Sequence, residues 1–319
     1  MMNRLLDKAQ SGAELTREDA LTLLGMETGS MEYYRLLGIA NAEARARFQG
    51  KGSILAQIGI EASPCPGNCA FCSLAESVFS KENGFLLPVE TAEHIADVLV
   101  SQGAEELFLM TTANYTNADF LDYAAKVRRH LPEGMRFVAN VGDFDRDYAK
   151  ELRKVGFTGV YHVCRLREGI DTDLPLEKRI ATIEAACEAG LERYYCVEPI
   201  GPEHTYEEMV EEMLRARKYS ADVAAVMKRT CVPGSVLAAK GEVSSAELAK
   251  ICAVGELVMK PKRAMGVHEP DVLSLMAGAN QIYAEVSVNP RDLSLSTETS
   301  RGASMEKARG FMRAANWIV

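Results

Sequence analysis

The sequence predicts a parallel (β/α)₈ barrel of the TIM type, preceded by an N-terminal helical extension. After residue 50, short β-rich segments alternate with helical segments, and each pair takes roughly 25–35 residues, the size of one strand–helix unit. Eight such pairs follow one another, and no linker, low-complexity tract or short-period repeat interrupts them. A doubly wound open sheet would show the same alternation, so this alternative fold stays open.

Residues 1–49 are predicted to form the helical extension, and residues 50–319 the barrel with a C-terminal tail. An Ala/Leu/Glu-rich stretch near residues 15–25 and an amphipathic stretch over Met31–Phe48 have helical character. A chain of 319 residues suits one large barrel or two modest domains.

The predicted strands are short runs rich in apolar residues, many of them β-branched or aromatic. They are Ile54–Glu61, Glu106–Thr111, Arg136–Val141, Gly159–Cys164, Arg193–Val197, Val223–Arg229, Arg263–His268 and Gln281–Val286. The predicted helices between them carry apolar residues at helical spacing. They are Val89–Gln102, Asn117–His130, Asp145–Val155, Leu176–Ala189, Tyr206–Tyr219, Ser245–Lys260, Asp271–Ala277 and Ser304–Asn316. Gly103, Gly156 and Gly190 follow three of these helices, as a left-handed C-cap favours.

The composition of the chain argues against several classes of function. Hydrophobic residues make up 47% and charged residues 25% of the chain, which is ordinary for a globular protein. The net charge of −9 argues against a nucleic-acid or anionic-membrane surface, because both would favour a basic face. The N-terminal stretch has no signal-peptide core, and no run of 18 apolar residues occurs. Eight cysteines without an export signal favour reduced thiols and a cytoplasmic location.

Three of these cysteines, Cys65, Cys69 and Cys72, lie within the stretch EASPCPGNCAFCSLAE, in the loop after the first predicted strand. In a barrel this loop lies at the C-terminal face, where catalytic loops gather. A C-x₃-C-x₂-C cluster is one ligand short of a closed zinc site or a saturated iron–sulfur cubane. Pro66 and Gly67 keep the loop non-helical, so that three sulfurs can converge. The pattern favours a [4Fe–4S] cluster with one open iron. A zinc site completed by a distant residue, or inert buried thiols, are the alternatives.

The cysteine pattern resembles that of the radical S-adenosylmethionine (SAM) superfamily, in which the open iron binds SAM. Reductive cleavage of SAM then yields methionine and a 5′-deoxyadenosyl radical. Over roughly residues 30–300 the chain resembles the biotin synthase group of that superfamily. This group also includes a hydrogenase maturase, methylornithine synthase and two-protein lipoyl synthases. The Met276–Asn280 segment, MAGAN, is similar to biotin synthase. The resemblance implies a [4Fe–4S] cluster and SAM as cofactors, and an electron donor of the flavodoxin or ferredoxin type.

The resemblance also implies cofactor-binding residues at successive strand ends. Hydroxyls after the second strand would hold the SAM amino group, although the usual Gly-Gly-Glu is absent. The stretch CRLREG after the fourth strand resembles the Arg-x-Glu stretch of the hydrogenase maturase. Together with an arginine in the following helix, it would hold the carboxylate and ribose of SAM. A segment after the fifth strand would lie along adenine, and an aromatic side chain in the cysteine loop would form an apolar wall. These residues are Thr111, Thr112, Arg165, Arg167, Glu168, Arg179, Ile200 and Phe71.

The chain departs from biotin synthase where that enzyme binds its second, sulfur-donating cluster. Two of the ligand cysteines are replaced, and so is the arginine ligand near the seventh strand. Cys164, Cys196 and Cys231 nevertheless fall at or just past the ends of three consecutive predicted strands. If all three faced the central cavity, they could hold a second iron–sulfur cluster. The alternative is that they are small core residues.

Two classes of reaction follow from the resemblance. The first is sulfur insertion into an unactivated carbon, as in biotin or lipoyl formation, with the second cluster as sulfur source. The alternative is radical rearrangement or fragmentation of a small molecule in cofactor assembly, without that cluster. A non-catalytic iron–sulfur or zinc protein is a third reading. The substrate would be a small molecule or one bound to a carrier protein, and no catalytic residue is assigned. The expected substrate contacts at strand ends are Tyr161, His162, Tyr195, His204, His268 and Glu269.

Overall fold

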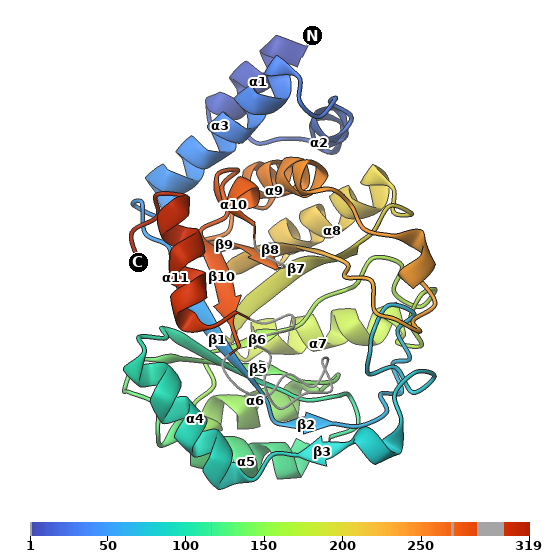
Figure 1. Cartoon of the computed structure of the whole chain (residues 1–319), viewed down its shortest axis with the longest axis vertical. Helices are drawn as coiled ribbons and strands as arrows, with labels where there is room; N and C mark the ends of the chain where they lie inside the picture. Colours follow the sequence, from blue (N-terminus) through green and yellow to red (C-terminus); the bar gives the residue numbers. More distant parts are fainter. Residues whose placement is uncertain (1, 116, 269–270, 286–302) are drawn as a thin grey trace.

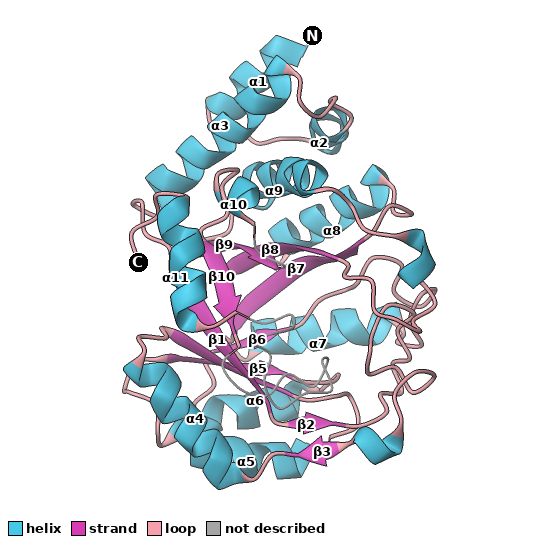
Figure 2. Cartoon of the chain, in the orientation of Figure 1, coloured by secondary structure: helices cyan, strands magenta, loops and turns pink. Residues whose placement is uncertain are grey.

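The structure is a computed structural model that describes residues 2–115, 117–268, 271–285 and 303–319. Its centre is a closed barrel of parallel strands surrounded by helices (Figures 1 and 2). The strand order is β1–β10–β9–β8–β7–β6–β5–β4. These strands are β1 (Ser53–Gly59), β4 (Glu106–Met110), β5 (Arg136–Asn140), β6 (Gly159–Tyr161), β7 (Glu192–Ile200), β8 (Val223–Lys228), β9 (Ala264–His268) and β10 (Gln281–Ala284).

The predicted (β/α)₈ barrel is confirmed. Strand β1 pairs with β10 on one side and with β4 on the other, so the sheet has no free edge. This closure excludes the doubly wound open sheet. Each predicted strand overlaps a barrel strand. The sequence did not reveal the short antiparallel pair of β2 (Glu61–Ala62) and β3 (Phe85–Leu86), which precedes and follows the cysteine loop.

Helices cover the outside of the barrel. They are α4 (Val89–Ser101), α5 (Asn117–Arg128), α6 (Arg146–Val155), α7 (Leu176–Glu188), α8 (Tyr206–Lys218), α9 (Ser245–Met259), α10 (Val272–Leu275) and α11 (Met305–Ala314). Two 3₁₀ turns lie over Lys81–Asn83 and Ala238–Lys240. Helix α6 ends at Gly156, whose φ of 105° is the left-handed C-cap predicted from the sequence.

Three helices precede β1, namely α1 (Met2–Gln10), α2 (Arg17–Leu24) and α3 (Met31–Arg47). Thr16 and Ser30 cap the N-termini of α2 and α3 with their side-chain oxygens, which explains where these helices begin. In Figure 1 the three helices lie on one side of the barrel, where α3 packs against α9. A division of the chain at residue 49 stays a prediction.

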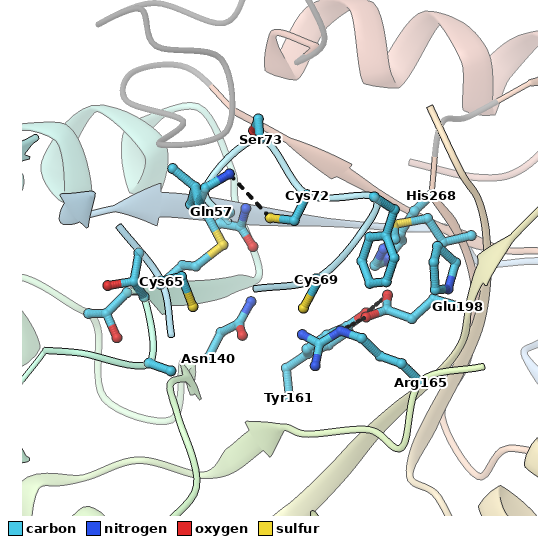
Figure 3. A pocket seen from close by; sticks show the side chains of 18 of the residues that line it. Gln57, Cys65, Cys69, Cys72, Ser73, Asn140, Tyr161, Arg165, Glu198 and His268 are labelled. Atoms are coloured by element: carbon cyan, nitrogen blue, oxygen red, sulfur yellow. Dashed lines mark hydrogen bonds and ion pairs between the residues drawn. The ribbon is translucent and has the colours of Figure 1, made fainter. Parts of the chain in front are cut away.

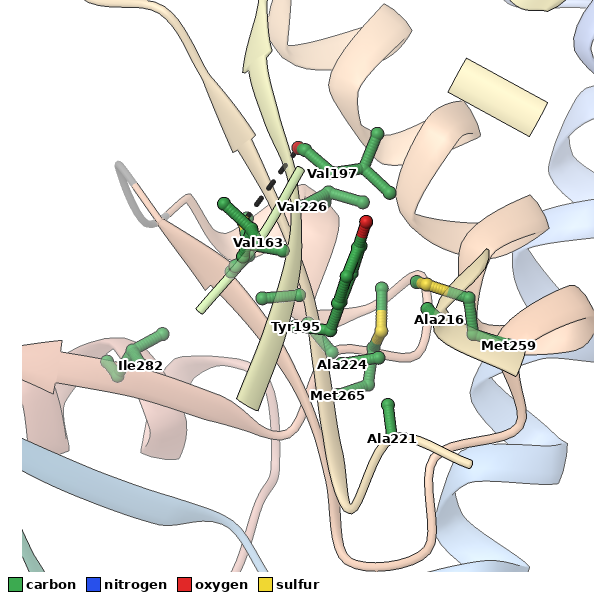
Figure 4. Packing of buried hydrophobic residues seen from close by; sticks show 14 of the residues in the cluster. Val163, Tyr195, Val197, Ala216, Ala221, Ala224, Val226, Met259, Met265 and Ile282 are labelled. Atoms are coloured by element: carbon green, nitrogen blue, oxygen red, sulfur yellow. Dashed lines mark hydrogen bonds between the residues drawn. The ribbon is translucent and has the colours of Figure 1, made fainter. Parts of the chain in front are cut away.

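Side chains alternate between the two faces of the barrel wall. The inward-facing cluster comprises Leu55, Phe108, Val138, Tyr194, Val223, Ala264 and Tyr283. The outward-facing side chains pack under the helices, and Figure 4 shows Tyr195 lying among Ala224, Met265 and Met259. Both faces of the strands are therefore buried, as is usual in a parallel barrel.

The amino-terminal end of the barrel is filled by a polar network. Arg263 forms an ion pair with Glu106, which is 1% exposed. Tyr194 donates a hydrogen bond to the same carboxylate at 2.8 Å, and Gln281 donates another at 3.2 Å. With this end closed by side chains, open space remains at the carboxyl-terminal ends of the strands.

Candidate active site

A cavity lies at the carboxyl-terminal ends of the strands, under the loop that follows β1 (Figure 3). Inward-facing side chains of the strands form its floor and walls. They are Leu55, Gln57, Phe108, Met110, Asn140, Tyr161, Glu198, Met227, His268 and Tyr283. Residues after the strands complete it. They include the loop residues Cys65, Cys69, Phe71, Cys72, Thr111, Thr112, Arg165 and Arg229, and Arg179 of α7.

The cysteine loop is held in shape by its own backbone. The amide of Cys65 donates to the Leu74 carbonyl at 2.8 Å, and the amide of Glu76 donates back to the Cys65 carbonyl at 3.2 Å. The Cys72 amide donates to the Cys69 carbonyl at 2.9 Å. These bonds close the loop on itself and fix the backbone positions from which the three thiols project.

Two neighbouring segments hold this loop against the barrel. The Ala70 amide donates to the Asp171 carbonyl at 2.9 Å, and the Ala70 carbonyl accepts from the Leu237 amide at 3.0 Å. Gly67 lies so close to Leu174 that an added Cβ would stand 3.1 Å from its side chain. Segments after β6 and β8 therefore position the loop, which the sequence alone does not reveal.

The three thiols of Cys65, Cys69 and Cys72 surround a common space at the top of the cavity (Figure 3). They do not form a group whose sulfurs all lie within 4.8 Å of one another. A tetrahedral zinc ion would hold such sulfurs roughly 3.8 Å apart, whereas each thiolate of a cubane binds a different iron. The three sulfurs therefore lie farther apart than one tetrahedral zinc ion would hold them.

Cys69 is the most buried of the three. Burial raises the pKa of its thiol to about 12, and the nearby Arg165 guanidinium acts in the opposite direction. The cation beside the loop thus offsets part of the effect that burial has on this thiol.

Arg165 itself lies between two carboxylates in the cavity wall. Its Nε lies 3.7 Å from Glu198 Oε1, and its Nη1 lies 3.9 Å from Glu168 Oε2. Tyr161 donates its hydroxyl to the other Glu198 oxygen at 2.5 Å. Nη1 of Arg165 is buried and has no hydrogen-bond partner among the described residues. The guanidinium therefore offers a donor to an anionic group bound in the cavity.

The expectation for Arg167 was wrong. Its side chain turns away from the cavity, donating from Nε to Glu208 at 2.8 Å and from Nη2 to the Glu203 carbonyl at 2.8 Å. Glu168 is not among the residues that line the cavity, and its carboxylate accepts hydrogen bonds from the Arg165 amide and the Thr172 hydroxyl. The same carboxylate thus contacts both the backbone and the guanidinium of Arg165.

Arg179 lines the cavity as expected, but its guanidinium already donates hydrogen bonds to other residues of the protein. Its Nη1 donates to Asp143 at 2.9 Å, and its Nε donates to the Val163 carbonyl at 3.1 Å. Thr111, Thr112 and Phe71 also line the cavity. The Thr112 hydroxyl is held by a 2.7 Å hydrogen bond to the buried Glu61.

Several expected contacts point away from the cavity. His162 lies on the outer side, where its Nε2 contacts Asp143 at 3.0 Å. Burial lowers the pKa of His162 to about 3, so the ring is neutral. Tyr195 donates to Glu212 on α8, and His204 accepts from the Gly201 amide.

Ile200, expected beside adenine, has its side chain in the outer core. Tyr161 and His268 line the cavity as expected, with their rings stacked at 6.0 Å. Glu269 lies outside the described residues.

The predicted convergence of Cys164, Cys196 and Cys231 was wrong. Cys164 lies on the outer side of the wall, where its amide donates to the Tyr195 hydroxyl at 3.3 Å. Cys196 lies on the inner face, two residues before Glu198. Cys231 sits in the loop after β8 and donates its thiol to the Ala238 carbonyl at 3.3 Å. Consecutive strand ends share a face of the barrel only when their residues have the same register, and these three do not.

Sequence reasoning missed several polar residues of the cavity, among them Gln57, Asn140 and Glu198. Each of these three is a polar side chain at the inward register near the end of an otherwise apolar strand. That position was the one sequence signal that could have revealed them, since a buried polar group in a strand requires partners.

The family model of the Radical SAM superfamily matches residues 64–217. The biotin synthase of Pelotomaculum thermopropionicum is 26% identical over 301 residues, covering 88% of this chain and 91% of the relative. The biotin synthase of Bacillus subtilis is 24% identical over 302 residues, covering 88% and 86% of the two chains.

Two solved structures share the fold. Methylornithine synthase (PylB) superposes with a TM-score of 0.82 at 19% identity, covering 97% of this chain and 95% of that chain. The hydrogenase maturase HydG from Carboxydothermus hydrogenoformans superposes with a TM-score of 0.82 at 14% identity, covering 98% and 77%. No helix among the described residues is long and apolar enough to span a membrane. Residues 64–217 therefore belong to the radical SAM superfamily, and the chain as a whole is similar to the biotin synthase group of that superfamily.

Proposed function

We propose that this radical SAM enzyme rearranges or fragments a small polar molecule, without a sulfur-donating cluster formed by Cys164, Cys196 and Cys231. The observation that carries the proposal is the opposite orientation of Cys164 and Cys196 on the two faces of the barrel wall. A cluster cannot be bound through a wall of packed side chains, so these three thiols cannot act together.

The radical SAM family implies a [4Fe–4S] cluster and SAM. The residues at the top of the cavity fit both groups, because three thiols face one space and a buried arginine donor lies beside them. Cys65, Cys69 and Cys72 would hold the cluster. When bound and reduced, the cluster supplies one electron for the cleavage of SAM to methionine and a 5′-deoxyadenosyl radical.

The chain's own side chains bind and shield the reacting groups. Arg165 would donate from Nη1 to the SAM carboxylate, and the strand end at Thr111 offers hydroxyl and carbonyl oxygens to an ammonium group. Below them, the stacked rings of Tyr161 and His268 exclude water from the space a substrate would occupy. Glu198, Asn140 and Gln57 make that space polar, which favours a small molecule with hydrogen-bonding groups.

Sulfur insertion is the second candidate, and the similarity to biotin synthases over 88% of this chain favours it. It would require a sulfur source other than the three cysteines considered above. Iron content separates the two candidates, because rearrangement needs about four irons per chain and a second cubane would bring about eight.

The test is anaerobic reconstitution followed by iron analysis and incubation with SAM and dithionite. We expect about four irons per chain and formation of 5′-deoxyadenosine. The variant with Cys65→Ala, Cys69→Ala and Cys72→Ala should lose both, whereas Cys187→Ala, at a half-buried site on α7, should retain both. Retained cleavage in the triple variant would overturn the assignment of the cluster thiols. About eight irons would overturn the preference for rearrangement.

A further inference from the structure

Cys196, Glu198 and His268 form a second group of potential metal ligands, separate from the cysteine loop. One sulfur, one carboxylate oxygen and one imidazole nitrogen of these residues lie within 4.8 Å of one another. We propose that this group binds a single divalent transition-metal ion of the Zn²⁺ type in the wall of the cavity. The proposal goes beyond the reaction proposed above and does not depend on it.

Strand geometry explains why these side chains meet. Cys196 and Glu198 are two residues apart on β7 and therefore point to the same, inner face. His268 ends β9, on the far side of β8, and its register partner there is Met227. The three donors come from two strands separated by one, which are rigid elements of the barrel.

Small residues between the two strands leave room for the donors. At the level of Cys196, the partners along the sheet are Ala225 on β8 and then Gly266 on β9. A Cβ added at Gly266 would lie 3.1 Å from the Ala225 side chain. Little side-chain volume therefore lies beside the Cys196 thiol, and the imidazole of His268 can approach this thiol.

The ring of His268 is also held in place. It stacks on Tyr161 with ring centres 6.0 Å apart and meets Tyr283 edge-on at 5.3 Å. Tyr161 in turn donates its hydroxyl to Glu198. A ligand carboxylate that also accepts a hydrogen bond is typical of metal sites, because the second contact orients it.

The donor set fits one metal ion rather than a cluster. A thiolate, an imidazole and a carboxylate are the three ligand types that Zn²⁺ takes, and three protein ligands leave one position open. Tetrahedral zinc would hold these donors roughly 3.3–3.6 Å apart, and in the structure they already lie within 4.8 Å of one another. Glu198 and His268 line the cavity, whereas Cys196 lies behind them, so the open position would face the cavity.

The experiment uses the reconstituted chain, in which the loop thiols are occupied. The protein is incubated with Zn²⁺ and desalted, zinc is measured by mass spectrometry, and the zinc environment is measured by X-ray absorption. We expect about one zinc per chain with one sulfur and otherwise nitrogen or oxygen ligands. No retained zinc, or three or more sulfur ligands, would overturn the proposal.

Variants locate the site. Cys196→Ser and His268→Gln should each lower zinc affinity at least about tenfold, the usual order for a lost ligand contact. Cys231→Ser is the matched control and should bind zinc like the parent, because its thiol faces Ala238. Equal zinc binding by Cys196→Ser would refute the site. Far-UV circular dichroism checks folding, and 5′-deoxyadenosine formation is measured on the same samples. Loss of that activity in the parent would count against the proposed reaction and not against the metal site.

Discussion

Two arginines of one loop provide a sharp test of SAM binding. Arg165 and Arg167 are separated by one residue, and the sequence gives no reason to prefer either. In the structure, Arg165 lines the cavity, and its buried Nη1 has no hydrogen-bond partner among the described residues. Arg167 instead pairs with Glu208 at 2.8 Å outside the cavity. We expect Arg165→Gln to weaken SAM binding and Arg167→Gln to leave it nearly unchanged.

The magnitude follows from the contact that Arg165 would lose. A hydrogen bond between charged groups contributes about 1.5–3 kcal/mol, which corresponds to roughly a 10- to 150-fold rise in the SAM concentration at half-maximal rate. Arg167→Gln should change that concentration by less than about threefold, since it removes only contacts to α8 and the loop before it.

The assay measures 5′-deoxyadenosine formation against SAM concentration in reconstituted protein with dithionite. Iron content must be equal in the parent and both variants, so that cluster loss does not explain the result. If Arg167→Gln raised the SAM concentration at half-maximal rate as much as Arg165→Gln does, the assignment of Arg165 to SAM binding would be refuted. An unchanged concentration dependence for Arg165→Gln would refute it as well.

Two further predictions concern stability. In the unfolded chain His162 takes up a proton near pH 6.5, whereas burial lowers its pKa to about 3 in the folded protein, so stability should fall as the pH drops below 6.5. We expect His162→Gln to reduce the loss of unfolding free energy between pH 7 and pH 5 by up to about 2 kcal/mol in urea titrations. A variant whose unfolding free energy depends on pH in the same way as that of the parent would contradict this. Gly159→Ala should destabilise by about 1–3 kcal/mol, because its Cβ would lie 2.7 Å from Tyr194. Gly38→Ala, in α3 with nothing within 4 Å, should instead stabilise by about 0.5–1 kcal/mol, and thermal unfolding that ranks the two variants in the opposite order would refute the packing argument.

The amino-acid sequence was sufficient to predict the eight alternating strands and helices and the cysteine loop, whereas the closure of the sheet into a barrel was decided by the structure. Each strand and most helices of the barrel are marked by local composition, periodicity and glycine exits, which act within a few residues. The spacing of Cys65, Cys69 and Cys72 is also local, since all three lie on one loop whose backbone bonds to itself. Local signals of this kind can be recognised in the sequence without knowledge of the tertiary structure.

The tertiary structure alone decided which residues at the strand ends face the cavity. In β7, every residue from Tyr194 to Ile200 is buried, so the sequence shows no alternation that would separate the inward Cys196 from the outward Tyr195. After β6, Cys164 and Arg167 face outward while Arg165 faces inward. The Cys164 amide contacts the Tyr195 hydroxyl on β7, and Arg167 contacts Glu208 on α8. A parallel strand packs apolar side chains on both faces, and its orientation is fixed only when the barrel closes and the helices cover it.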